Sequence, residues 1–258
     1  MKILAILGSP RKGNSYQITR RLESKLKELG EVEFEYIFLK DIDIRPCQGC
    51  FSCTSKGEEN CPIRDDCPAV LDKMMAADGV IFVSPVYALS VTGLMKNFKD
   101  RLAYNAHRPR FFGKYAMAVA TSAGTGLEGT LGYLETFSLW GFEFVRGLAL
   151  MQYPYLQPTP ALEQQTAEKI ERAARRFYRA IEEKKQRPPS LNRVLQFRVL
   201  KCNTRAAGDY WQADREFYEN KRDYFYKAKI APQHQLAAWL FERFYWGYMR
   251  KNYVLIKD

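Results

Sequence analysis

Short, nearly continuous apolar runs recur along the first 150 residues and predict the strands of a buried parallel sheet. Residues 2–7, 79–84 and 115–120 are such runs, and Gly, Ser, Pro or Thr stops each of them. A strand covered on both faces carries apolar side chains at consecutive positions, whereas a half-exposed strand alternates. Residues 32–39, which alternate, and residues 142–150 complete a set of five predicted strands.

Segments with helical spacing of apolar residues separate these strands. Residues 14–29 are the longest of them, and we expect further helices over residues 68–77, 91–104 and 127–140. Strands that alternate with helices form an α/β fold. The predicted fold is a doubly wound, five-stranded parallel sheet of strand order 2-1-3-4-5.

The pattern changes after about residue 160. Residues 161–185 predict a long charged helix, and Pro188 and Pro189 then interrupt the chain. We therefore expect a first domain at residues 1–186 and an extension at residues 187–258. The extension has no strand-like stretch, so we expect it to be helical, and its many aromatic side chains require burial against something.

Composition and charge set bounds on location and partners. The chain has 258 residues, of which 47% are hydrophobic, but it lacks an apolar run long enough to span a bilayer. It starts with a strand rather than a signal peptide, so we expect a cytoplasmic protein. The extension carries 14 Lys or Arg and 7 Asp or Glu, so it supplies +7 of the net charge of +11. Such a surface attracts anionic partners, and charge alone does not choose among them.

The segment from Gly8 to Ser15 follows the first predicted strand directly and precedes a helix. That position predicts a phosphate-binding loop, because backbone N–H groups and the positive end of the helix dipole face an anion there. An ordinary capped turn is the alternative reading of this loop alone. The sequence lacks the Walker lysine, the G-x-G-x-x-G pattern and a Cys-x5-Arg cradle. A bound phosphate that is not transferred remains, as on flavin mononucleotide (FMN).

Two further loops are expected at the same edge of the sheet. In a sheet of order 2-1-3-4-5, ligands bind beside the carboxyl ends of the first and third strands, where the winding reverses. The third strand ends at Pro85, Val86 and Tyr87, and the fourth ends in the small residues 121–126. Three such loops together indicate a site more strongly than any one of them.

Cysteines are crowded between the second and third predicted strands. Their spacing is Cys47-x2-Cys50-x2-Cys53-x7-Cys61, which suits a cubane iron-sulfur cluster. Zinc bound by four thiolates, or no metal at all, are the alternatives. Cys67 and Cys202 lie outside this set, and we expect both to be buried small apolar residues.

Four motifs in order resemble the flavodoxin-like NADPH-dependent FMN reductases and, within them, the iron-sulfur flavoproteins. They are ILGSPRKGNS (residues 6–15), PCQGCFSC (46–53), CPIRDD (61–66) and the segment at 77–101. The resemblance implies FMN, held by its phosphate and ring in the loops above. The implied cofactor-binding residues are Ser9, Arg11, Gly13, Asn14, Ser15, Pro85, Val86, Tyr87, Thr121, Ser122, Ala123 and Gly124. The implied ligands of a 4Fe-4S cluster are Cys47, Cys50, Cys53 and Cys61.

The expected function is that of an FMN-dependent oxidoreductase. Electrons would pass from NAD(P)H or a reduced iron-sulfur partner through FMN to a small acceptor. The alternative is an electron carrier that exchanges electrons with ferredoxin and has no small-molecule substrate of its own. Flavin chemistry is intrinsic to the cofactor, so we expect no catalytic side chain and assign His107 and His234 to the surface.

The role of the extension is left open by its sequence. Dimer formation or a lid over the flavin is our first expectation, in keeping with a homo-oligomer. A membrane-surface helix comes second and nucleic-acid binding third, and plain packing outweighs both of these.

Overall fold

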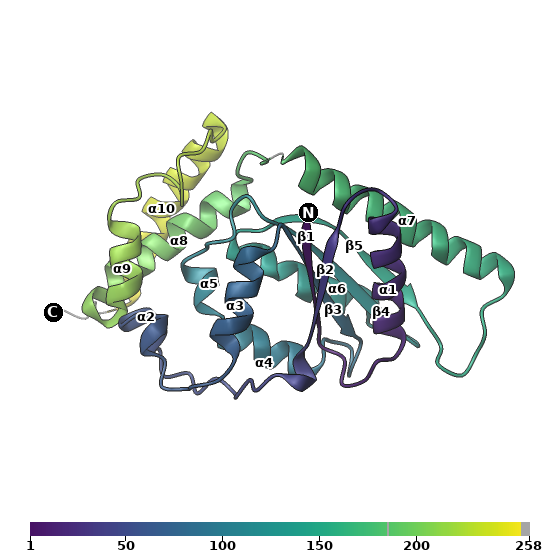
Figure 1. Cartoon of the computed structure of the whole chain (residues 1–258). Helices are drawn as coiled ribbons and strands as arrows, with labels where there is room; N and C mark the ends of the chain where they lie inside the picture. The colour runs from purple at the N-terminus through teal and green to yellow at the C-terminus, as the bar shows by residue number, and fades with distance from the viewer. Residues whose placement is uncertain (185, 254–258) are drawn as a thin grey trace. The chain divides into compact units, whose positions relative to one another are not determined.

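A computed structural model describes residues 1–184 and 186–253. Residue 185, at the end of the expected helix 161–185, and residues 254–258 of the extension lie outside the described residues. Five parallel strands form one sheet in the order β2-β1-β3-β4-β5 (Figure 1), which confirms the predicted fold. The strands are β1 (Lys2–Leu7), β2 (Glu33–Phe38), β3 (Gly79–Pro85), β4 (Tyr115–Ser122) and β5 (Glu143–Met151).

Helices cover both faces of this sheet (Figure 1). On one face α1 (Asn14–Lys27) packs with α7 (Pro160–Glu183), and Leu22 and Phe177 are fully buried there. The other face carries aromatic packing, in which Phe82 of β3 stacks on Phe137 with ring centroids 3.8 Å apart. The helices on that side are α3 (Cys67–Ala76), α4 (Gly93–Arg101) and α6 (Leu127–Glu135), the last continued by the 3₁₀ turn Thr136–Trp140.

The chain divides into two compact units. Unit 1 contains the sheet and comprises Met1–Cys47, Asp65–Ala103 and Arg110–Lys185. Unit 2 comprises Gln48–Arg64, Tyr104–Pro109 and Gln186–Asp258. The cysteine loop (residues 48–64) and the short segment 104–109 therefore belong to the same unit as the C-terminal extension. The linear order of the chain does not indicate this grouping.

Unit 2 is helical in its described residues, as expected for the extension. Its longer helices are α8 (Leu191–Ala207), α9 (Gln212–Glu219) and α10 (Pro232–Asn252); its short ones are α2 (Ser52–Ser55) and α5 (Tyr104–His107). Phe197 of α8 is fully buried and contacts the rings of Tyr218, Tyr224 and Phe225. These four aromatic residues thus form a core within unit 2.

No helix within residues 1–184 and 186–253 combines the length and the apolar character needed to cross a membrane. The two cysteines outside the spaced set are buried as expected, since Cys67 is 2% exposed and Cys202 is 4% exposed.

Candidate functional site

A cavity of about 390 Å³ opens at the carboxyl ends of β1, β3 and β4, within unit 1. Its volume lies in the range typical of small-molecule sites. The loops after these strands supply most of the lining. The lining residues are Ser9, Arg11, Gly13, Asn14, Ser15, Pro85, Val86, Tyr87, Thr121, Ser122, Ala123, Gln152 and Pro154.

The N-terminus of α1 points its unpaired amide groups toward this cavity. Gly13 is the N-cap residue, and none of the described side chains caps the helix. The first turn contains no acidic residue. The first backbone N–H groups of a helix lack partners within the helix and carry partial positive charge. An anion beside Gly13, Asn14 and Ser15 would accept hydrogen bonds from these N–H groups and would be attracted by their partial positive charge.

Hydrogen bonds between the loops fix the shape of the cavity. The hydroxyls of Ser15 and Thr121 lie 2.7 Å apart and join the start of α1 to the end of β4. Asn14 Nδ2 donates to the carbonyl oxygen of Gln152 at 3.0 Å, which adds the end of β5. Ser15 is 2% exposed and Thr121 is 3% exposed, so this junction is held away from solvent.

The loop after β3 forms a tight and strained turn. Ala88 and Leu89 have φ angles of 47° and 64°, and Tyr87 and Ser90 pair across them. Left-handed backbone at two consecutive residues other than Gly has an energetic cost and is concentrated at functional sites. The turn projects Tyr87, whose side chain is 46% exposed, at the rim of the cavity.

Gly126 allows the loop after β4 to approach this turn. Its φ is +90°, and a Cβ atom there would lie 2.8 Å from Val86 Cγ1 and 3.0 Å from the Cα atom of Leu89. A side chain at position 126 would therefore push the two loops apart.

The structure gathers all but one of the twelve predicted cofactor-binding residues around this one cavity. Gly124 does not line it, whereas Gln152 and Pro154 do and were missed. Lys12, a basic residue of the same loop, does not line the cavity and places its ammonium 4.9 Å from the ring centroid of Phe38. The missed pair follows β5, the neighbour of β4, so the predicted strand order was the signal that could have found it.

Comparison with known proteins identifies the family of this chain. Residues 1–151, more than half of the chain, match the family described as NADPH-dependent FMN reductase. The chain belongs to this family. The matched residues include every strand of the sheet and all of the cavity lining except Gln152 and Pro154.

Iron-sulfur flavoproteins are among the relatives of this FMN reductase family member. One from Archaeoglobus fulgidus is 40% identical over 146 residues, 55% of this chain and 64% of its own. One from Clostridioides difficile is 31% identical over 200 residues, covering 76% of this chain and 86% of its own. A Bacillus anthracis structure described as an FMN-dependent NADH-azoreductase in complex with FMN shares the fold, with a TM-score of 0.51. That similarity covers 69% of this chain and 100% of the other, at 18% identity.

The four spaced cysteines are all at least partly accessible. Cys47 and Cys50 are exposed, and Cys53 and Cys61 are partly exposed. Cys47 ends a segment of unit 1, and the other three belong to unit 2. Among the residues that the structure describes, no three or more His, Cys, Asp or Glu side chains are arranged to hold a metal ion. The four spaced cysteines nevertheless offer four thiol groups, which are the ligands that an iron-sulfur cluster requires.

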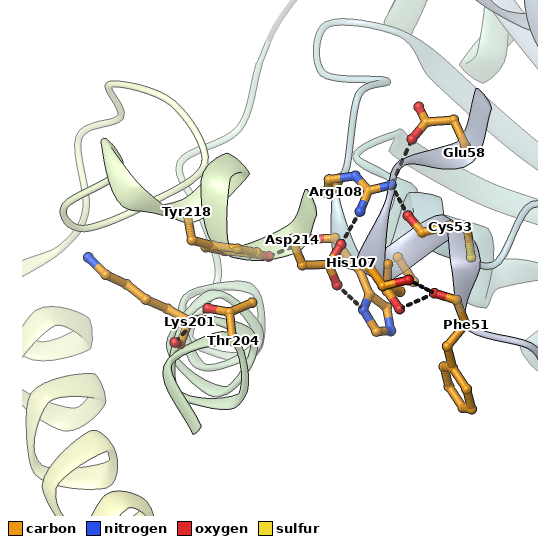
Figure 2. A network of polar contacts seen from close by, with 12 residues as sticks. Phe51, Cys53, Glu58, His107, Arg108, Lys201, Thr204, Asp214 and Tyr218 are labelled. Carbon is orange, nitrogen blue, oxygen red and sulfur yellow. Dashed lines mark hydrogen bonds and ion pairs between the residues drawn. The ribbon is translucent and has the colours of Figure 1, made fainter. Parts of the chain in front are cut away.

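A buried charge network holds the cysteine loop inside unit 2 (Figure 2). Asp214 of α9 is fully buried and pairs with the Arg108 guanidinium, and its other carboxylate oxygen lies 2.6 Å from His107 Nδ1. Arg108 also donates to the carbonyl oxygen of Cys53 at 2.6 Å and to Glu58 at 2.7 Å. His107 is thus a partner of Asp214, and its side chain remains 27% exposed.

A second buried ion pair, in unit 1, follows the cysteine loop. Arg101 donates to Asp65 at 2.9 Å, and their side chains are 6% and 0% exposed. Burial opposes ionisation of Asp65, but hydrogen bonds from Arg101 and from the N–H groups of Arg45 and Cys67 outweigh it. The pKa of Asp65 is therefore lower than usual. Asp65 thus fixes the segment that leads into α3 within unit 1.

Proposed function

We propose that this chain is an FMN-dependent oxidoreductase that binds FMN in the cavity of unit 1. The observation that carries the proposal is the convergence of an uncapped helix N-terminus and three strand-end loops on one cavity of about 390 Å³. Family membership and the FMN named for the azoreductase structure support it.

The residues at the two ends of the cavity suit the two ends of FMN. Asn14, Ser15 and the amide groups of the first turn of α1 would hold the phosphate, with Arg11 adding charge. Tyr87 and the loop at residues 121–123 would flank the isoalloxazine ring. When bound, FMN supplies the redox chemistry, and the protein orients it and sets its surroundings.

The proposed electron donor is NAD(P)H or a reduced iron-sulfur partner, and the proposed acceptor is a small molecule that reaches the ring. The proposed location is the cytoplasm.

We also propose that the protein forms a homo-oligomer. The outward-facing apolar side chains of α10, among them Leu236, Leu240 and Phe244, would be covered in it.

Binding of FMN is the direct test of this proposal. We expect the purified chain to quench the fluorescence of added FMN at a stoichiometry of about one per chain and to gain thermal stability from it. If the protein neither retains FMN nor is stabilised by it, the proposal is wrong. This outcome does not depend on whether the cysteines bind a metal cluster.

The cysteine set supports a second candidate function, an electron carrier that exchanges electrons with ferredoxin. In this candidate function the protein would carry a 4Fe-4S cluster in addition to FMN. The cluster would be held by Cys47, Cys50, Cys53 and Cys61. The relatives named iron-sulfur flavoproteins favour it. Slow NAD(P)H oxidation with fast exchange to ferredoxin would distinguish the carrier from the enzyme.

We expect protein purified without oxygen to contain iron and acid-labile sulfide, and Cys50→Ala to lose both while still binding FMN. Cys202→Ala is the matched control, because burial raises the pKa of the Cys202 thiol to about 11 and keeps it protonated at neutral pH. Wild-type protein with FMN but without iron and sulfide would remove the cluster and leave the flavin proposal intact.

A further inference from the structure

Unit 2 contains a cavity of its own, between α8, α9 and α10. Its volume is about 650 Å³, larger than that of the cavity in unit 1. The lining residues are Arg198, Lys201, Cys202, Thr204, Arg205, Gly208, Arg215, Tyr218, Glu219, Trp239, Glu242, Arg243 and Trp246. Five of these side chains are cationic and two are carboxylates, so the lining carries an excess of positive charge.

Three of the five cations already have partners in the folded unit. Arg198 pairs with Asp223 at 3.0 Å and with Glu242 at 2.9 Å. Arg215 pairs with Asp209 at 2.5 Å. The ammonium of Lys201 donates to the backbone carbonyl oxygens of Lys221 and Arg222. These contacts build the walls of the cavity and leave little of this charge for a ligand.

Arg205 and Arg243 differ from these three. The Arg205 guanidinium carbon lies 4.4 Å from the ring centroid of Trp246, and that of Arg243 lies 5.2 Å from Trp239. Within residues 1–184 and 186–253, no carboxylate pairs with either guanidinium. Both side chains are exposed, so a solute can reach them. A guanidinium stacked on an indole keeps its N–H groups in its own plane, directed away from the ring and free to grip an oxyanion.

The two indoles add an aromatic surface beside these cations. Trp239, Arg243 and Trp246 are spaced by four and three residues on α10, so they share one face of the helix. Trp239 remains 49% exposed, so part of its indole is accessible to a solute. Glu242, the carboxylate nearest to this face, is already paired with Arg198, and Glu219 is exposed to solvent.

We propose that this cavity binds a small molecule of the nucleotide class, a planar ring that carries a phosphate. The guanidiniums of Arg205 and Arg243 would hold the phosphate in bidentate hydrogen bonds, and the indole of Trp239 would contact the ring. A volume of about 650 Å³ among three helices matches a small ligand, whereas a nucleic-acid strand requires an extended groove. The site is separate from the flavin cavity and does not depend on the proposed redox function.

The test is calorimetric titration of the full chain with AMP, GMP, CMP and UMP. We expect at least one of them to bind with a Kd below about 1 mM. The R205A/R243A double variant should weaken that binding at least about tenfold, the size expected for lost charge-assisted hydrogen bonds. The parent nucleoside, which lacks the phosphate, should bind at least about tenfold more weakly as well.

Two matched variants make the result specific to this cavity. Arg250→Ala removes an exposed arginine of α10 that does not line it, and Asn14→Asp changes a residue that lines the cavity of unit 1; neither should change nucleotide binding. Thermal unfolding of the double variant at the wild-type temperature shows that it folds. The proposal is wrong if none of the four nucleotides binds with a Kd below about 1 mM, if the nucleoside binds equally well, or if R205A/R243A binds the nucleotide as tightly as the wild type.

Discussion

Replacing Asn14 with Asp should lower the affinity for FMN at least about 100-fold. The substitution changes almost no volume, but it puts a negative charge beside the place where the proposed site holds a phosphate dianion. Two like charges about 4 Å apart repel by about 4 kcal/mol at an effective dielectric constant near 20. A loss of 100-fold corresponds to about 2.7 kcal/mol, so the expectation is conservative.

The same substitution should leave the protein folded, with a modest loss of stability. Asn14 is the first residue of α1, where a carboxylate interacts favourably with the helix dipole. The cost is the hydrogen bond from Asn14 Nδ2 to the carbonyl oxygen of Gln152, which loses this donor and faces a carboxylate oxygen instead, about 1–3 kcal/mol. Lost affinity would therefore report on the anion site and not on unfolding.

Flavin fluorescence titration measures this effect, and Gln17→Glu is the matched control. Gln17 lies one turn along the same helix, is exposed and does not line the cavity. It adds the same charge to α1 without facing the proposed phosphate. Equal affinity of Asn14→Asp and wild type would show that the phosphate lies elsewhere.

The sheet and most of the cavity could be predicted because their signals are local. The three central strands β1, β3 and β4 are nearly continuous apolar runs, and the winding rule for parallel sheets then brings their ends together. Lys12 shows the limit of this reasoning. A basic residue in a phosphate loop suggests an anion contact, but its side chain packs over Phe38 of β2, which lies well beyond the loop in sequence.

The organisation of unit 2 could not be predicted, because pairings between distant residues create it. Arg108 and Asp214 are 106 positions apart, and neither has a distinctive sequence context. Asp65 lies just before α3 and accepts a hydrogen bond from the N–H group of Cys67 there, but its carboxylate is also buried against Arg101, 36 positions away. Buried ions need partners, but the sequence does not say which residue of opposite charge supplies one.

Replacing Asp214 with Ala should lower the free energy of unfolding of unit 2 by about 3–5 kcal/mol. The variant removes the buried carboxylate that pairs with both Arg108 and His107, and leaves the Arg108 guanidinium, which is 7% exposed, with only the partly exposed Glu58 as its ion partner (Figure 2). Arg108 also holds the Cys53 carbonyl oxygen and Glu58, so its displacement should open the cysteine loop. Urea unfolding measures the first effect, and the rate of tryptic cleavage at the exposed Lys56 measures the second.

Asp209→Ala is the matched control for this prediction. It removes the same side chain from the same unit, but the Arg215–Asp209 pair is 43% and 62% exposed, and such pairs contribute at most about 1 kcal/mol. Asp214→Asn, which keeps the shape and one acceptor oxygen, should fall between the two and remains measurable if Asp214→Ala does not fold. Asp214→Ala could instead lower the free energy of unfolding no more than Asp209→Ala does and leave Lys56 protected from trypsin. In that case the position of the Arg108 side chain does not depend on Asp214. The link between the C-terminal extension and the cysteine loop would then have to rest on other contacts of α9.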